Sequence, residues 1–381
     1  MPSRRTILTF TGGGLAPALN ATLFGIIREA QRRKFRVLGG MYGWASLGRN
    51  GRMVDLTKLN VASISKIGGT FLRSSRTNLV RQPDGVQMIE ERMKQWKVDA
   101  LIPVGGNDTL GAAKILSEHG VTIIGVPKTI DNDLEATYWT PGYPSAARYM
   151  ADFVREIRDD AAYALSRIFI IESPGRDSGW LAAAGAMGGA DVVVPPERKV
   201  SRKNFLAALR RRYEANGNFA VAVVAEHARF DDPTIQGKAS DQVDEFGVKR
   251  VNFITVGLRD LIKNSLGIDS KALVPANFFE TGRPFPEDRV VAEQLGRHAV
   301  QLVNRNISGR MASVRRSGNR LDVTDVPLAV AVKRDRVLDD TYFDFKNFRP
   351  KAKFFNYLAP AFPSDYRRRD SAYLKLLRRL P

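Results

Sequence analysis

Residues 100–133 read ALIPVGGNDTLGAAKILSEHGVTIIGVPKTIDND. Within this stretch, Ala100–Val104 and Thr122–Val126 are short apolar runs of the kind that forms buried strands, and Thr109–His119 between them has helical spacing. A strand, a helix and a second strand in this order predict parallel strands joined by a crossover helix. The glycines and acids of the stretch follow the two strands, at the carboxyl edge where such sheets bind ligands.

The same alternation continues along the chain and predicts an α/β fold. Parallel sheets are covered by helices on both faces, so their strands are short continuous apolar runs. Besides those above, the predicted strands are Ile7–Phe10, Ile168–Ile171, Val192–Val194 and Ala220–Val224, and the predicted helices are Ala18–Arg33 and Tyr149–Leu165.

The composition is that of a globular protein with a basic surface. A chain of 381 residues is long enough for two domains. The net charge of +19 fits a surface that attracts polyanionic small substrates. No nucleic-acid-binding motif accompanies the basic residues, and no run approaches the ~20 apolar residues that cross a bilayer. Because the sequence has no cysteine, disulfides and thiolate metal sites are excluded. We therefore expect a cytoplasmic protein without a specific nucleic-acid or membrane partner.

Glycine-rich segments follow several predicted strands or apolar runs. Gly12–Gly14 precede a helix, so their backbone N–H groups suit an anion. Gly68–Arg76 combine a glycine turn with hydroxyls and two arginines, which is the composition of a phosphate cradle. A plain turn explains either segment equally well. Gly105 and Gly106 are followed by Asp108, and a carboxylate at this position is also an ordinary helix cap.

The pair Asp131 and Asp133 is harder to explain by packing. Both follow a predicted buried strand, and Lys128 lies three residues before the first of them. Capping would use only one carboxylate. A lysine beside two carboxylates suits a site where a phosphate, Mg²⁺ and a proton acceptor meet.

The motifs GGTFLRSSR (68–76), PVGGNDT (103–109), PKTIDND (127–133) and ESPGRDSGW (172–180) together resemble the phosphofructokinase family in the family's own order. The resemblance runs from the N-terminus to about Val303. It implies two domains, each a mainly parallel sheet sandwiched by helices, with a C-terminal extension. The implied domains are 1–140 with 255–303 for the phosphoryl donor and 141–254 for the sugar phosphate. Residues 304–381 would form a crossing segment and a basic extension, with a last helix near Ala372–Leu380.

The resemblance also implies residue roles. Asp131 would take the proton from the attacking sugar hydroxyl, Arg76 would bridge the transferring phosphoryl group, and Lys128 would complete the catalytic set. Arg167 resembles an arginine that reaches into a neighbouring subunit's acceptor site, so a homodimer or homotetramer is expected. The donor would contact Gly12, Gly13, Gly14, Gly105, Gly106, Asp108 and Thr109; the acceptor Thr129, Asp133, Arg167, Gly175, Arg176, Glu226 and Lys271; and Mg²⁺ Asn107 and Asp108.

Relatives that use ATP typically have glycine at the positions of Asp108 and Lys128, whereas pyrophosphate users have Asp and Lys. The side chain of Asp108 would fill space that a nucleotide needs, and Lys128 adds charge for the smaller anion. Fructose 6-phosphate and pyrophosphate are therefore the expected substrates.

Three departures from the family pattern keep alternatives open. Asn107 replaces an acidic Mg²⁺ ligand, and Asn277 and Glu280 stand where many relatives bind the acceptor's phosphate with cations. The alternatives are an ATP-dependent enzyme, a kinase of another sugar phosphate, or a catalytically weak member that serves as a basic binding protein.

Overall fold

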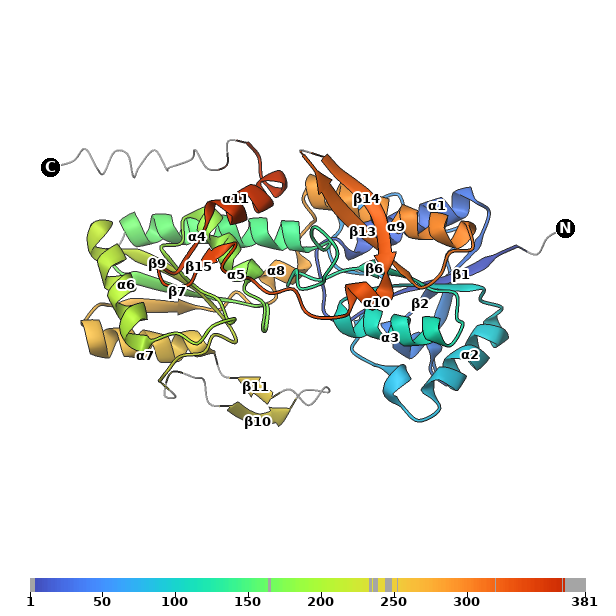
Figure 1. Cartoon of the computed structure of the whole chain (residues 1–381), viewed down its shortest axis with the longest axis horizontal. Helices are drawn as coiled ribbons and strands as arrows, with labels where there is room; N and C mark the ends of the chain where they lie inside the picture. The colour runs from blue at the N-terminus through green and yellow to red at the C-terminus, as the bar shows by residue number, and fades with distance from the viewer. Residues whose placement is uncertain are drawn as a thin grey trace. The chain divides into compact units, whose positions relative to one another are not determined.

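The structure is a computed structural model that describes residues 4–163, 166–232, 235, 239–243, 249–251, 253–318, 320–364 and 366. The chain divides into two compact units. The first contains the described residues up to Ala146 together with Glu280–Arg336, and the second contains Ala147–Phe279 and the described residues from Val337. Each unit is an α/β structure (Figure 1).

The first unit is built on an eight-stranded sheet with the order β14-β13-β6-β5-β1-β2-β3, and β4 also pairs with β1. Its central strands are parallel, and the β13–β14 and β2–β3 pairs are antiparallel. The strands are β1 (Thr6–Gly12), β2 (Arg36–Gly40), β3 (Met53–Asp55), β4 (Ser74–Ser75), β5 (Ala100–Gly105), β6 (Ile124–Pro127), β13 (Arg310–Ser317) and β14 (Arg320–Pro327).

Helices cover both faces of this sheet. Figure 1 shows α1 and α9 on one side of the strands and α2 and α3 on the other. The helices are α1 (Leu19–Arg32), α2 (Gly85–Trp96), α3 (Asn107–Glu118), α9 (Pro286–Asn304) and the short α10 (Leu328–Ala331).

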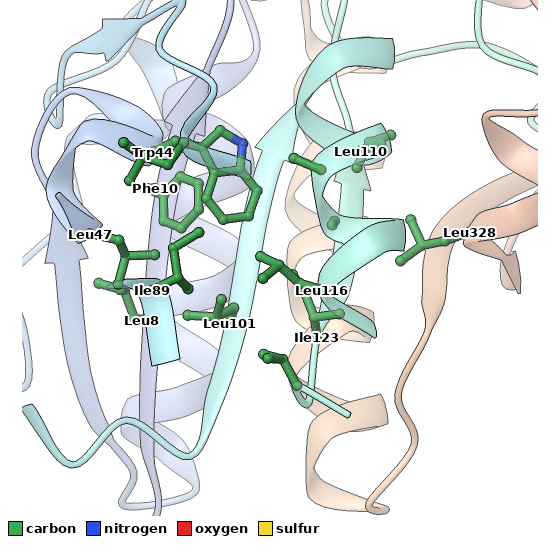
Figure 2. Close-up of a cluster of buried hydrophobic side chains, with 14 of the residues drawn as sticks. Leu8, Phe10, Trp44, Leu47, Ile89, Leu101, Leu110, Leu116, Ile123 and Leu328 are labelled. Carbon is green, nitrogen blue, oxygen red and sulfur yellow. The ribbon is translucent and has the colours of Figure 1, made fainter. Parts of the chain in front are cut away.

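The core of the first unit lies between the sheet and the α2–α3 layer (Figure 2). Alternate residues of β1 face this layer, so Leu8 and Phe10 are fully buried. The ring of Trp44 packs edge-on against Phe10 with centroids 4.6 Å apart, so Trp44 is a packing residue of this core. A buried side chain of this size contributes about 1.5–3 kcal/mol.

On the other face, α1 and α9 approach closely because each has a glycine at the contact. A Cβ added to Gly25 would lie 2.1 Å from the carbonyl oxygen of Glu293, and one added to Gly296 would lie 2.3 Å from that of Thr22. Both distances are shorter than any real Cβ contact, so only glycine allows this spacing.

The second unit contains a parallel sheet with the order β12-β7-β9-β8. In Figure 1, α4 lies on one face of this sheet and α7 on the other. Its strands are β7 (Ile168–Ser173), β8 (Val192–Val194), β9 (Ala220–Ala225), β10 (Ala239–Val243), β11 (Lys249–Val251), β12 (Ser270–Leu273), β15 (Phe343–Asp344) and β16 (Arg349–Pro350), and its helices are α4 (Tyr143–Tyr163, which begins in the first unit), α5 (Trp180–Ala184), α6 (Arg202–Ala215), α7 (Ile254–Leu266), α8 (Phe278–Thr281, which ends in the first unit) and α11 (Ala352–Leu358).

Trp180 joins this sheet layer to the C-terminal part of the chain. Its ring lies 5.0 Å from Tyr342, 5.1 Å from Tyr357 and 6.0 Å from Phe354, measured between centroids. Trp180 is fully buried, so it is a packing residue. The segment from Tyr342 to Tyr357 is therefore held on the second unit by an aromatic core.

The predicted α/β class, with mainly parallel sheets between helices, is confirmed. Two predicted domain bounds need correction. The sequence predicts a return to the first domain near residue 255, but the structure places it between Phe279 and Glu280 because β12 first pairs in parallel with β7. The sequence also predicts a crossing near residue 303, whereas the first unit continues to Arg336 because β13 pairs with β6 and then with β14.

The first crossing, predicted near residue 140, falls after Ala146. The helix expected near Ala372–Leu380 lies outside the described residues. Within the described residues, no helix is both long and apolar enough to span a membrane.

Candidate active site

The strand register of the first unit brings four predicted site segments to one edge. Gly12 is aligned with Ser75 on β4, and Gly105 is aligned with Pro127 on β6. Thr11 pairs with Val104, which sets the ends of β1 and β5 level. Because these strands are parallel, the segments that follow them leave the same carboxyl edge, where α/β sheets bind ligands.

The predicted donor glycines serve two different purposes. A Cβ on Gly12 or Gly105 would lie 2.4 Å from the buried side chain of Thr109, so packing alone explains both glycines. Gly13 has a φ of +83° and Gly14 has nothing within 4 Å of an added Cβ. Gly14 is exposed and thus leaves its backbone accessible, as an anion site requires, whereas Gly13 provides the left-handed turn beside it.

The second glycine segment is fastened beside the first. The hydroxyl of Ser74 donates to the carbonyl oxygen of Gly13 at 2.7 Å, and the Gly13 N–H donates to Ser75 at 3.0 Å. Asn20, buried at the start of α1, donates to Ile67 and Gly68 and accepts from the Phe71 N–H. Arg76 follows β4 directly and is exposed. Sequence reasoning missed the role of Asn20 as the anchor of this segment.

A tight turn holds the two carboxylates after β6. Asn132 has a φ of 56°, a left-handed conformation that Asn tolerates, and its buried side chain accepts the Thr140 N–H at 3.2 Å. The Asp131 N–H donates to the Thr129 hydroxyl at 3.1 Å. The turn therefore fixes the backbone of Asp131, and Asp133 follows two residues later.

Lys128 is buried between this turn and the first glycine loop. Its ammonium group donates to the carbonyl oxygen of Gly14 at 2.8 Å. Burial lowers the pKa of Lys128 below its usual range, while the nearby charges of Asp131, Asp133 and Glu280 oppose that shift. A buried cation surrounded by carboxylates and an open glycine loop is suited to a small, highly charged anion.

Asp133 lies near a carboxylate that belongs to no sequence motif, Asp335. Burial, together with the charges of Asp131 and Asp335, raises the pKa of Asp133 to about 7. The Asn107 amide nitrogen donates to Asp133 at 3.1 Å and to Asp335 at 2.6 Å. A carboxyl group with a pKa near 7 can exchange protons at neutral pH.

The donor set around Asn107 fits a hard cation such as Mg²⁺. Within the described residues, Oδ1 of Asn107 and Oδ1 of Asp133 are buried and have no hydrogen-bond partner. No group of three or more Asp, Glu, His or Cys side chains in that part of the chain is arranged to hold a metal alone. Protein-bound Mg²⁺ usually has one or two carboxylates and completes its shell with water and substrate phosphates. Asp108, the other predicted ligand, is exposed and lies 4.0 Å from Arg81.

In the second unit, Gly175, Arg176 and Glu226 come together at the carboxyl edge. β7 and β9 pair with Ser173 opposite Ala225, so the residues that follow are neighbours. Glu226 Oε1 accepts the N–H groups of Gly175 at 3.0 Å and Arg176 at 2.8 Å. Gly175 and Arg176 both have positive φ, at 137° and 51°, so the carboxylate holds a strained loop.

Arg167 and Lys271 lie elsewhere on this sheet. Arg167 immediately precedes β7, is buried, and lies 3.8 Å from Asp269. Lys271 is opposite Phe169, the second residue of β7. A strand of this length spans about 20 Å, so the structure does not bring these two cations to Gly175 within one subunit.

Comparisons with known proteins identify the family. The phosphofructokinase family model matches residues 6–303. The chain belongs to the phosphofructokinase family. It is 37% identical over 327 residues to the pyrophosphate–fructose 6-phosphate 1-phosphotransferase of Dictyoglomus thermophilum, which covers 86% of this chain and 93% of that protein. It is 32% identical over 338 residues to ATP-dependent 6-phosphofructokinase 3 of Streptomyces coelicolor, covering 87% of this chain and 96% of that protein.

The fold agrees with this assignment. The crystal structure of a pyrophosphate-dependent phosphofructokinase from Marinobacter aquaeolei superposes with a TM-score of 0.83 at 22% identity, covering 94% of this chain and 91% of that one. Relatives of both donor classes are thus similar to this chain, and the chain is a phosphotransferase.

The geometry gives Glu280 and Asp335 roles that the sequence alone does not indicate. Glu280 lies close enough to Lys128 for its charge to raise that pKa, so it faces a cation of the first unit. Asp335 contacts Asn107 but lies beyond the family match, which ends at residue 303. No sequence motif marks Asp335, so only the fold reveals its place in the site.

Proposed function

We propose that this chain transfers a phosphoryl group from pyrophosphate–Mg to the 1-hydroxyl of fructose 6-phosphate, giving fructose 1,6-bisphosphate and phosphate. The sugar O1 forms a bond to one phosphorus as the bridging P–O bond of pyrophosphate breaks in line. The hydroxyl proton passes to Asp131. With pyrophosphate as the donor, the resemblance to the family implies a reaction that is close to reversible.

The observation that carries this proposal is the position of the Lys128 ammonium. It is buried, bonded to Gly14 at 2.8 Å, and close enough to Asp131 and Asp133 for their charges to act on it. A cation, a proton acceptor and accessible backbone at one sheet edge are the parts that phosphoryl transfer needs, because this reaction depends on positioning and charge stabilisation.

The remaining residues take roles consistent with their places. Gly13, Gly14 and Gly106 would accommodate the donor's phosphates, with Gly12, Gly105 and Thr109 packed beneath them. Arg76 would stabilise the charge of the transferring group. Gly175, Arg176 and Glu226, which come together in the second unit, would bind the sugar phosphate. Asn107, with Oδ1 of Asp133 beside it, would hold Mg²⁺, which would neutralise phosphate charge when it is bound with the donor. Asp108, which is exposed near Arg81, would not be required for metal binding.

Two features favour pyrophosphate over ATP. Lys128 places a positive charge against the glycine loop, and the exposed Asp108 lies in the first turn of α3, where we expect its side chain to exclude a bulkier donor. ATP is the alternative donor, since ATP-dependent relatives are 32–34% identical to the chain. Asn277 and Glu280 keep another sugar phosphate open as the acceptor, and a catalytically weak basic binding protein is the remaining alternative.

A donor-by-acceptor activity grid with two sets of variants tests the proposal. The wild type should use pyrophosphate–Mg and show little activity with ATP–Mg. Asp108→Gly should raise ATP use, whereas Asp108→Asn, which keeps the bulk, should not. Lys128→Met removes one charged contact with the donor, worth about 1.5–3 kcal/mol, so pyrophosphate use should fall roughly ten- to a hundredfold. Robust wild-type activity with ATP and none with pyrophosphate would overturn the donor assignment.

The proposed assembly is a homodimer or homotetramer. Arg167 and Lys271 lie away from the Gly175 loop of their own subunit, so they would serve the acceptor site of a second copy.

A further inference from the structure

The side-chain amide of Asn107 connects two carboxylates from distant parts of the chain. Its nitrogen donates to Asp133 at 3.1 Å and to Asp335 at 2.6 Å, and Asp335 lies 228 residues further along. In an amide only the nitrogen end donates, and both donations of Asn107 meet carboxyl oxygens. Two carboxylates on one side therefore determine which way the amide points.

This orientation leaves the carbonyl oxygen of Asn107 on the other side of the group. In the described part of the chain that oxygen is buried and accepts no hydrogen bond, and the same holds for Oδ1 of Asp133. A buried polar atom without a hydrogen-bond partner costs about 1–3 kcal/mol, so the presence of two such oxygens on hydrogen-bonded residues indicates that a ligand binds them. Amide and carboxylate oxygens are ligands that Mg²⁺ accepts.

Asp335 is held in place independently of Asn107. Leu134 and Asp335 form an antiparallel bridge, and the Arg336 N–H donates to the carbonyl oxygen of Asp133 at 2.6 Å. The Arg336 guanidinium also donates to the backbone of Tyr138 at 2.8 Å. The segment around Asp335 is thus fastened to the loop that carries Asp133, and its carboxylate is presented to Asn107 by a fixed backbone.

We propose that Asp335 is a positioning residue that fixes the Asn107 amide so that its carbonyl oxygen is available to the Mg²⁺ of the phosphoryl donor. This inference rests on the proposed phosphoryl transfer. It assigns Asp335 a role through a hydrogen bond and not through its charge. An acceptor at position 335 is required; a carboxylate is not.

The test measures binding of Mn²⁺, as a probe for Mg²⁺, from the EPR signal of the free ion, with the protein alone and with each donor. Loss of a partner that orients a metal ligand typically weakens metal binding about 10–100-fold. Asp335→Ala should show this loss, and Asp335→Asn, whose carbonyl still accepts, should stay within about threefold of wild type. Unchanged binding in Asp335→Ala, or an equal loss in Asp335→Asn, would overturn the proposal.

A second pair of variants keeps the test decisive if Asp335→Ala does not fold. Asp335→Leu keeps most of the side-chain volume but offers no acceptor, so it should weaken Mn²⁺ binding about 10–100-fold. Asn107→Ala removes the carbonyl oxygen itself, and adding Asp335→Leu to it should cause no further loss, because Asp335 acts only through Asn107. An Asp335→Leu variant that binds as tightly as wild type, or a further loss in the double variant, contradicts the coupling. Mn²⁺ binding is measured without turnover, so these results are independent of the donor-by-acceptor activity grid. If the activity grid fails while Mn²⁺ binding changes as expected, the proposed function is wrong but the role of Asp335 in metal binding is still supported.

Discussion

The ammonium group of Lys128 lies among charges of both signs. Burial lowers its pKa most, Asp131, Asp133 and Glu280 raise it, and Arg76 lowers it further. Glu280 stands where many relatives have a cation, and a carboxylate there would repel an anionic acceptor. Its position near Lys128 gives it a different task, because its charge offsets part of the cost of burying the ammonium group.

Glu280→Gln should therefore change the pH dependence of donor use. Without the Glu280 charge, the pKa of Lys128 falls further, and the cation is lost at a lower pH. The alkaline limb of the pH profile of kcat/KM for pyrophosphate should move to lower pH by up to about one unit. The KM for fructose 6-phosphate should stay near the wild-type value at neutral pH.

The matched control is Glu118→Gln, an exposed carboxylate at the end of α3 that pairs with Lys114. It should leave the profile unchanged. An unmoved profile in Glu280→Gln would separate Glu280 from Lys128. A strong gain in fructose 6-phosphate use would instead place Glu280 against the acceptor and count against that substrate.

At the scale of single residues, the sequence predicts the site residues that follow strands, but it does not predict the residues that hold those site residues in place. Lys128, Asp131 and Asp133 lie in one motif after a predicted parallel strand, which suffices to place them at the same sheet edge as Gly13. Asn20 and Asp335 act through contacts with residues 48 and 228 positions away, respectively. Nothing local distinguishes Asn20 from a helix-start residue or Asp335 from a surface acid.

At the scale of elements, strands that are continuous apolar runs were predictable, whereas strands without such a run, including the buried β2, were not. The predicted strands, such as Ala100–Val104, are continuous apolar runs, and the structure has them within two residues. β13 and β14 were missed because β14 is only partly buried and is rich in polar residues. Their antiparallel pairing, and the parallel pairing of β12 with β7, join segments whose partners no local pattern reveals.

Two helix glycines should respond to alanine in opposite directions. In Gly25→Ala the new Cβ would lie 2.1 Å from the Glu293 carbonyl oxygen, so α1 and α9 must separate, at a cost of about 1–3 kcal/mol in the free energy of unfolding. In Gly111→Ala on α3 nothing lies within 4 Å, and the better helix propensity should add about 0.5–1 kcal/mol. Chemical denaturation measures both. An unchanged free energy of unfolding in Gly25→Ala would mean that α1 and α9 can separate without loss of stability.

At the scale of the whole molecule, the acceptor site determines the expected assembly. Arg167 and Lys271 are cations near the start of β7, whereas Gly175, Arg176 and Glu226 follow the ends of β7 and β9. If the two cations bind substrate, they do so in another copy. Assembly cannot be predicted from one sequence, because a surface that meets a second copy resembles any other basic surface in a chain with a net charge of +19.

Hybrid oligomers test this arrangement. Asp131→Asn alone should lower turnover by about 10²–10⁴-fold, since it keeps the shape and removes the proton acceptor. Arg167→Ala should weaken acceptor binding. Dimers purified through two different tags, one variant per subunit, should contain one intact site and recover about half of the wild-type activity. Hybrids no more active than their parents, or an active monomer by light scattering, would refute a trans role for Arg167.

The most direct measurement follows the wild-type protein by phosphorus NMR with pyrophosphate, Mg²⁺ and fructose 6-phosphate. The pyrophosphate signal should fall while the signals of phosphate and a new sugar 1-phosphate ester rise in equal amounts. The reverse reaction, started from fructose 1,6-bisphosphate and phosphate, should regenerate pyrophosphate. A pyrophosphate signal that stays constant while ATP is consumed in a parallel sample, or phosphate that appears without the ester, would contradict pyrophosphate-dependent phosphoryl transfer.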